Sequence, residues 1–295
     1  MLTRRELGLG AAAAALTGCG APVVHHTFPA PTSRQFPRDF IWGAATSAFQ
    51  IEGAWDEGGR GPSIWDVFPK SNIADGSDAS VACDSYHRYA EDVTLLAEQG
   101  LDAYRFSIAW PRIVPMGAGA ANQAGIDYYS RLVDALLAKH ITPYATLFHW
   151  DLPLALQQNG GWQRRDTAQR FADYAAIIGD KLGDRVKHFI IMHEPSVHAL
   201  AGHVLGIHAP GLKDAKLIGP LTHHINLAQG LAIQALRARR NDLKIGTTLA
   251  LTPSRPAPGG IGLNGLVADG FDQLWNRAYL APLLKGAYPD QAQKL

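Results

Sequence analysis

Short apolar segments rich in β-branched and aromatic residues recur along the chain, and each has the length of a buried strand. They cover residues 40–49, 103–110, 142–150, 187–192 and 244–251. Longer segments between them carry apolar residues three and four positions apart, which is the spacing of an amphipathic helix. The clearest helices are expected at residues 125–141, 167–182 and 221–240. This alternation predicts an α/β fold with a parallel sheet that helices cover.

Polar residues lie where the predicted strands end. Gln50 closes the first strand, and Arg105 lies within the second. His149 closes the third strand, and His193 and Glu194 close the fourth. Polar chemistry at the carboxyl ends of parallel strands is typical of a (β/α)8 TIM barrel and of an open doubly wound sheet. No Gly-x-Gly-x-x-Gly motif follows the first strand, which argues against a dinucleotide site and favours the barrel.

The spacing of the predicted strands limits how much of a barrel this chain can form. Successive strands start about 51 residues apart, so eight strand–helix units would need about 400 residues, within the range of barrels with insertions. The chain has 295 residues. We therefore expect about five of the eight units, that is, a truncated barrel over residues 36–295. Such a barrel would have open sheet edges, which favour aggregation.

Composition and charge exclude several other classes of protein. Lys and Arg total 27, and Asp and Glu total 26, so the chain lacks the basic excess that nucleic-acid binders need. The hydrophobic fraction of 47% is ordinary for a globular protein. Cys19 and Cys83 are the two cysteines, so no disulfide framework is available. Four histidines repeat every five residues from His193 to His208, and this spacing spreads them over different faces of an α-helix, so we expect no metal site.

The first 18 residues have the features of an export signal. Arg4 and Arg5 precede an Ala- and Gly-rich apolar run that is too short to span a bilayer, which matches a twin-arginine signal. The run ends in Leu16-Thr17-Gly18-Cys19, which resembles a lipobox and predicts a lipid on Cys19. Residues 19–35 would then tether residues 36–295 to a membrane. We expect an exported protein, either periplasmic or a membrane-anchored lipoprotein. The structural alternative is a hydrophobic helix packed on the body.

Five ordered motifs resemble those of the family 1 glycoside hydrolases, the β-glucosidase family. They are FPRDFIWGAATSAFQIEG (36–53), YRFSIAWPRI (104–113), LFHWDLP (147–153), HEP (193–195) with GIHAPG (206–211), and the groups DG, NR and GAYP between residues 269 and 289. The resemblance runs from about residue 34 to the end of the chain.

The resemblance implies a single (β/α)8 barrel that hydrolyses terminal β-D-glycosyl residues with retention of configuration. Retention requires two carboxyl groups about 5–5.5 Å apart, one as acid/base and one as nucleophile. Glu194 matches the acid/base residue of the family, which has to be protonated at the working pH in order to donate. The implied substrate is a β-glucoside or an oligosaccharide. No cofactor and no metal are implied, since two carboxyl groups and water suffice.

By the same resemblance, other residues hold the substrate or the nucleophile. Gln50, His149 and His193 would bind sugar hydroxyls, and an amide such as Gln50 offers both a donor and an acceptor. Trp150 would present its apolar ring to the sugar. Arg105 would keep the nucleophile ionised through charge-assisted hydrogen bonds. The structural alternatives are a backbone-bonded amide, a core histidine, a buried ring and a structural ion pair.

The sequence departs from the family pattern at three points. It contains no Thr-Glu-Asn-Gly-like motif, so we find no nucleophile glutamate in the 295 residues. His193 stands where the family has Asn, and Ala250 stands where the family often has Asn. Two hypotheses therefore stay open. The first is a β-glucosidase whose chain is truncated, and the second is a non-catalytic sugar-binding lipoprotein remnant.

Overall fold

The computed structural model describes residues 36–256 and 263–290. The chain divides into two compact units, a larger one of residues 41–253 and 271–295 and a smaller one of residues 1–40 and 254–270. The described part of the smaller unit includes Phe36 and Phe40, whose ring centroids lie 4.6 Å apart, and most of helix α10 (Leu263–Asp272). The predicted export signal (1–18), the predicted lipidation site Cys19 and the tether (19–35) lie outside the described residues.

Five parallel strands form the sheet of the larger unit, in the order in which they occur along the chain. They are β1 (Gly43–Ala45), β2 (Ala103–Ser107), β3 (Thr142–Phe148), β4 (His188–His193) and β5 (Lys244–Thr248). A doubly wound sheet reverses its strand order part-way, whereas a barrel adds each new strand on the same side of the last. The unreversed order is therefore that of a barrel arc. It confirms the predicted barrel family and the expected five strand–helix units.

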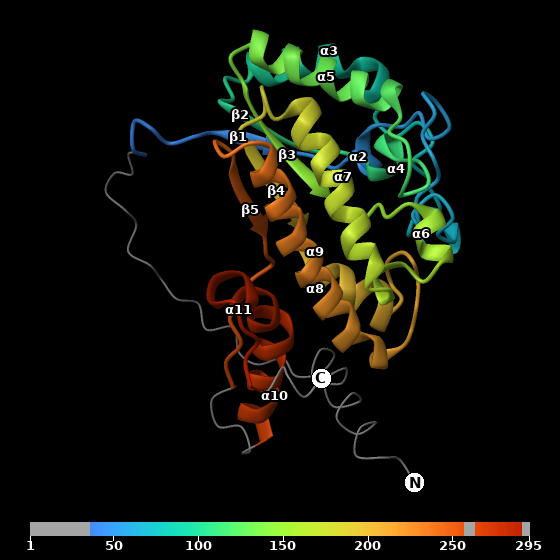
Figure 1. The fold of residues 1–295 in the computed structure, drawn as a ribbon, viewed down its shortest axis with the longest axis vertical. Helices are drawn as coiled ribbons and strands as arrows, with labels where there is room; N and C mark the ends of the chain where they lie inside the picture. Colours follow the sequence, from blue (N-terminus) through green and yellow to red (C-terminus); the bar gives the residue numbers. More distant parts are fainter. Residues whose placement is uncertain (1–35, 257–262, 291–295) are drawn as a thin grey trace. The chain divides into compact units, whose positions relative to one another are not determined.

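A long helix connects each strand to the next (Figure 1). These helices are α3 (Ser85–Glu98), α5 (Gln123–Ala138), α7 (Asp166–Leu182) and α9 (Ile218–Arg239). The three predicted helices are α5, α7 and α9, with ends that differ from the predicted ones by at most three residues. Sequence reasoning missed α3, which buries only Ser85 and Val93. Within the described residues, no helix is both long enough and apolar enough to cross a membrane.

Short helical segments fill the connections. They are α2 (Ala48–Ile51), α4 (Trp110–Ile113), α6 (Leu154–Gln158), α8 (Pro195–Ala199) and α11 (Ala278–Lys285), the 3-10 segments η1 (Lys70–Asn72), η2 (Gly161–Gln163) and η4 (Ala215–Leu217), and the π-helical segments η3 (Leu200–Val204) and η5 (Gln273–Arg277).

The first strand is much shorter than predicted. Only Gly43–Ala45 is extended in the sheet, and after Ser47 the chain turns into α2. The Ser47 hydroxyl donates to Gln50 Oε1 at 2.7 Å, and the Glu52 N–H donates to the Ala48 carbonyl at 2.9 Å. These local hydrogen bonds favour the helical turn over a longer strand. The prediction that Gln50 closes a strand is therefore wrong, because it lies on α2.

Buried aromatic side chains fix α7 against the ends of β2 and β3. Trp110 stacks on Tyr174 with 5.2 Å between ring centroids, and both rings are fully buried. The Tyr174 hydroxyl lies 3.0 Å from the Ile108 carbonyl and 3.1 Å from the Leu147 carbonyl, so it can donate to either. Burial of each large side chain contributes about 1.5–3 kcal/mol. The strand ends that carry the predicted site residues are thus held in place by the core.

A buried ion pair ties α2 to α4 and α5. Arg112 Nε donates to Glu52 Oε2 at 3.0 Å, and the two side chains are 0% and 6% exposed. The Tyr129 hydroxyl donates to the other Glu52 oxygen. The Arg112 guanidinium also lies 4.3 Å above the Tyr86 ring. All these contacts are internal, so Glu52 is a structural carboxylate.

Candidate active site

Five of the predicted site residues lie where β2, β3 and β4 approach their carboxyl ends. Arg105 lies in β2, His149 and Trp150 follow β3, and His193 ends β4 just before Glu194. The His149 and His193 rings lie 3.9 Å apart, centroid to centroid. Arg105 Nη1 lies 3.5 Å from His193 Nδ1, and Glu194 Oε2 lies 3.7 Å from His193 Nε2. The parallel register therefore brings together residues that are up to 89 positions apart in the sequence.

The backbone holds Glu194 at the rim of this cluster. Its φ of +46° and ψ of 62° fall in the left-handed region, which costs a non-glycine residue about 1–2 kcal/mol. Its N–H donates to the Thr248 carbonyl at 2.9 Å, and its carbonyl accepts from the His198 N–H at 3.1 Å. Pro195 starts α8 immediately afterwards, where its missing N–H costs nothing. The Glu194 side chain stays 30% exposed, so a ligand can reach it.

The two imidazoles of the cluster are uncharged. Burial, with the charges of His193 and Arg105 adding to it, lowers the pKa of His149 to about 3. Burial, followed by the nearby Arg105 charge, lowers the pKa of His193 to about 4. Burial also lowers the pKa of Arg105, and the Glu194 carboxylate opposes that effect. Both imidazoles are therefore uncharged at neutral pH.

Trp150 forms an aromatic wall next to the cluster. Its backbone is also left-handed, with φ +73°, and its indole N–H donates to the His193 carbonyl at 2.7 Å. Its ring lies 5.3 Å from the His208 ring, which in turn lies 5.7 Å from the Trp65 ring. Rings of this kind offer the apolar faces on which sugars stack.

Sequence reasoning missed two neighbours of the site. The Thr248 hydroxyl lies 3.0 Å from His193 Nδ1, and the His208 ring lies beside Trp150. The signal for Thr248 was a hydroxyl residue within the predicted fifth strand. His208 lay inside a motif already noted, but its contact with Trp150 depends on the fold.

Gln50 is placed differently from the other predicted residues. It is exposed on α2, and its amide oxygen accepts a hydrogen bond from Ser47. The contacts of the described residues do not join Gln50 to the cluster around Glu194. Its role in sugar binding therefore stays a prediction.

Two of the regularly spaced histidines meet, contrary to expectation. The rings of His198 and His203 lie 5.1 Å apart, and His203 Nδ1 donates to the His198 carbonyl at 3.2 Å. The reason is the π-helical segment η3, since its wider turn brings residues five apart nearly into line. Within residues 36–256 and 263–290, no group of three or more His, Cys, Asp or Glu side chains is arranged to hold a metal ion.

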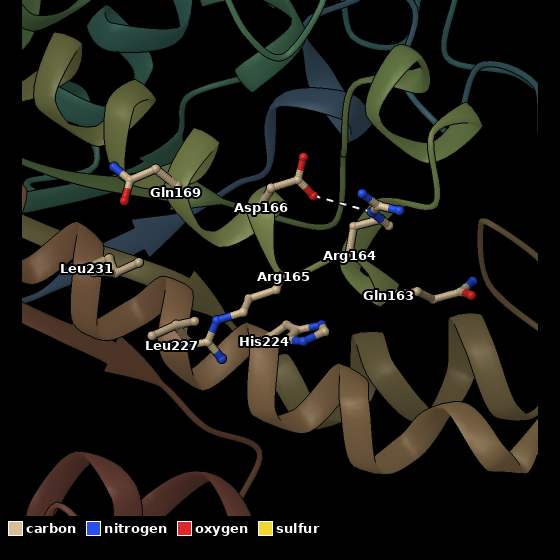
Figure 2. Close-up of a pocket in the computed structure, with 8 residues that line it drawn as sticks. All are labelled: Gln163, Arg164, Arg165, Asp166, Gln169, His224, Leu227 and Leu231. Atoms are coloured by element: carbon tan, nitrogen blue, oxygen red, sulfur yellow. Dashed lines mark ion pairs between the residues drawn. The ribbon is translucent and has the colours of Figure 1, made fainter.

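A separate cavity of about 740 Å³ lies between the start of α7 and α9 (Figure 2). It is lined by Gln163, Arg164, Arg165, Asp166, Gln169, His224, Leu227 and Leu231. Arg164 Nε lies 3.6 Å from Asp166 Oδ1 at its rim. None of the predicted site residues lines this cavity, so the candidate site is defined by the strand ends and not by this cavity.

Comparison with known proteins decides the family. The model of glycosyl hydrolase family 1 matches residues 32–295. The chain belongs to glycosyl hydrolase family 1. The motifs singled out in the sequence are therefore family 1 motifs, and the five-stranded arc is part of a family 1 barrel.

Several similar relatives are named β-glucosidases. The chain is 48% identical over 262 residues to "Beta-glucosidase A" of Acetivibrio thermocellus, covering 88% of this chain and 58% of that protein. It is 49% identical to "Thermostable beta-glucosidase B" of Thermobispora bispora, covering 88% of this chain and 53% of that protein. The crystal structure of a psychrophilic β-glucosidase from Micrococcus antarcticus superposes with a TM-score of 0.84 at 46% identity, covering 88% of this chain and 55% of that one. The chain thus spans little more than half the length of these relatives.

Proposed function

We propose that this family 1 chain carries the acid/base half of a retaining β-glycosidase site for terminal β-D-glucosides. Glu194 is the acid/base residue. The observation that carries the proposal is the position of its carboxylate, which is partly exposed on a left-handed backbone at the carboxyl end of β4. The similarity of the chain to proteins named β-glucosidases supports the proposed substrate class.

The proposed reaction uses Glu194 twice. Protonated Glu194 gives its proton to the glycosidic oxygen as the C–O bond breaks, while a second carboxylate attacks the anomeric carbon from the opposite face. Ionised Glu194 then takes a proton from water, and the resulting hydroxide releases the sugar with retained configuration. No Thr-Glu-Asn-Gly-like motif occurs in the sequence, so we propose that the attacking carboxylate comes from outside residues 1–295.

Azide tests this proposal because it can take the place of the attacking carboxylate. The full chain is incubated with phenyl β-D-glucoside, with and without azide. We expect phenol release only with azide, and α-glucosyl azide as the product, because azide attacks the face opposite the leaving group. Glu194→Ala should lower the release about 10²–10⁴-fold. Glu98→Ala, which removes an exposed carboxylate at the end of α3, should not change it.

Three outcomes would each overturn a part of the proposal. Undiminished phenol release in Glu194→Ala would refute the acid/base assignment. A folded chain that releases no phenol in azide would refute the glucosidase site itself. Hydrolysis without azide, with retention, would instead show that the nucleophile lies within the chain.

We also propose that the protein is exported and anchored by a lipid on Cys19. Support comes from the Arg4-Arg5 pair, the apolar run after it and the lipobox-like Leu16-Thr17-Gly18-Cys19. Fractionation of producing cells tests this proposal. The protein is expected in the membrane fraction, and recovery of unprocessed chain from the cytosol would contradict it.

A further inference from the structure

The Nδ1 atom of His193 has two hydrogen-bonding partners. Thr248 Oγ1 lies 3.0 Å away on β5, and Arg105 Nη1 lies 3.5 Å away on β2. A guanidinium only donates hydrogen bonds, so the Arg105 contact requires an unprotonated Nδ1. The Thr248 hydroxyl can donate or accept, so its direction has to come from its other neighbours.

The Thr248 hydroxyl has two acceptors within reach. Its Oγ1 lies 3.3 Å from the Met192 carbonyl, which also accepts from the Thr247 hydroxyl at 3.0 Å. His193 Nδ1, at 3.0 Å, is the nearer of the two acceptors. Because the Arg105 contact leaves Nδ1 without a proton, the Thr248 hydroxyl is the donor in its own contact with Nδ1. A neutral imidazole then has its single proton on Nε2.

The ring of His193 cannot easily turn away from this arrangement. It packs on the His149 ring with 3.9 Å between centroids, and its own carbonyl accepts from the Trp150 indole. Its Nε2 faces Glu194, with Oε2 at 3.7 Å. A small movement of the partly exposed Glu194 side chain would close that distance to a hydrogen bond.

We propose that His193 is a positioning residue for Glu194, in which Arg105 and Thr248 fix the Nε2-protonated tautomer and so aim an N–H at the Glu194 carboxylate. This inference deepens the proposed function and rests on it for the importance of Glu194. The fixed donor holds the ionised carboxylate in place during the half of the reaction in which it takes a proton from water. Burial of the ring keeps it neutral at neutral pH, so it offers a donor without adding a charge.

Nitrogen NMR of the full chain tests the tautomer directly. Long-range ¹H–¹⁵N spectra separate protonated from unprotonated ring nitrogens, and the His193→Gln variant identifies the His193 signals by their loss. We expect a single form with the proton on Nε2, whereas exposed His140 should show an exchanging mixture. A proton on Nδ1, or an exchanging mixture at His193, would overturn the proposal.

A matched pair of variants tests the contact with Glu194. Glu194→Gln replaces the proposed acceptor by an amide, so the Nε2–H proton signal of His193 should shift while the Nδ1 signal stays. Glu98→Gln, on the exposed end of α3, should move neither signal. An Nε2–H signal that ignores Glu194→Gln would show that His193 is only a packing residue. A failed azide reaction would count against the proposed function and leave this spectroscopic result standing, so the two failures are distinguishable.

Discussion

Replacement of His149 by Gln should make the protein much less sensitive to acid. Burial, with the charges of His193 and Arg105 adding to it, lowers the pKa of His149 to about 3, and an unfolded histidine has a pKa of about 6.5. Between these values the unfolded chain binds a proton that the native chain does not bind, so the free energy of unfolding falls as the pH falls. By about pH 4.5 this single residue costs on the order of 3 kcal/mol of stability.

Urea unfolding followed by tryptophan fluorescence, at about pH 7 and about pH 4.5, measures this cost. The stability lost between the two pH values should be about 3 kcal/mol smaller in His149→Gln than in the unmodified chain. Comparing the two losses cancels the titration of all groups that both proteins share. His140→Asn, at an exposed histidine with φ +60°, is the control and should lose as much as the unmodified chain. Equal losses in His149→Gln and the unmodified chain would refute the assignment of a buried, neutral His149.

Three further predictions concern other parts of the chain. Arg112→Met should lower the free energy of unfolding in urea by about 3–5 kcal/mol, because it leaves Glu52 buried and uncompensated; a loss below about 1 kcal/mol would show that the pair is not buried in solution. Trp150→Phe should cost about 1–3 kcal/mol by the same assay, because the His193 carbonyl loses its donor; unchanged stability would mean that water replaces the indole. Cys19→Ser should abolish the diacyl modification in mass spectra of the membrane fraction, and a variant that still carries it would reject the lipobox.

The spacing of apolar residues predicted the helices that bury one face and expose the other. The apolar stripes of α5 and α7 were readable because each buries seven or more residues on one face. Helix α3, of which only Ser85 and Val93 are buried, was missed. The segment 40–49 read as a strand from its apolar and aromatic composition, but the Ser47–Gln50 hydrogen bond favours a helical turn there.

The part of the candidate site that lies at the strand ends could be predicted from the sequence. Parallel strands place their carboxyl ends at one edge, so Arg105, His149 and Glu194 could be grouped from sequence alone. The contact of Thr248 with His193 could not, because the register between β4 and β5 is irregular between Ile190 and His193. The meeting of His198 with His203 requires a π-helical turn, which residue spacing does not reveal.

The central claim is that Glu194 protonates the leaving group. The most direct test compares how much activity Glu194→Ala loses with a poor and with a good leaving group. The azide reaction of Glu194→Ala is measured with phenyl β-D-glucoside and with dinitrophenyl β-D-glucoside. Phenol leaves poorly without a proton, so its release should fall about 10²–10⁴-fold, the usual contribution of general acid catalysis. Dinitrophenol needs no proton, so its release should fall less than about tenfold. Equal losses with both substrates would contradict the assignment of Glu194 as the acid.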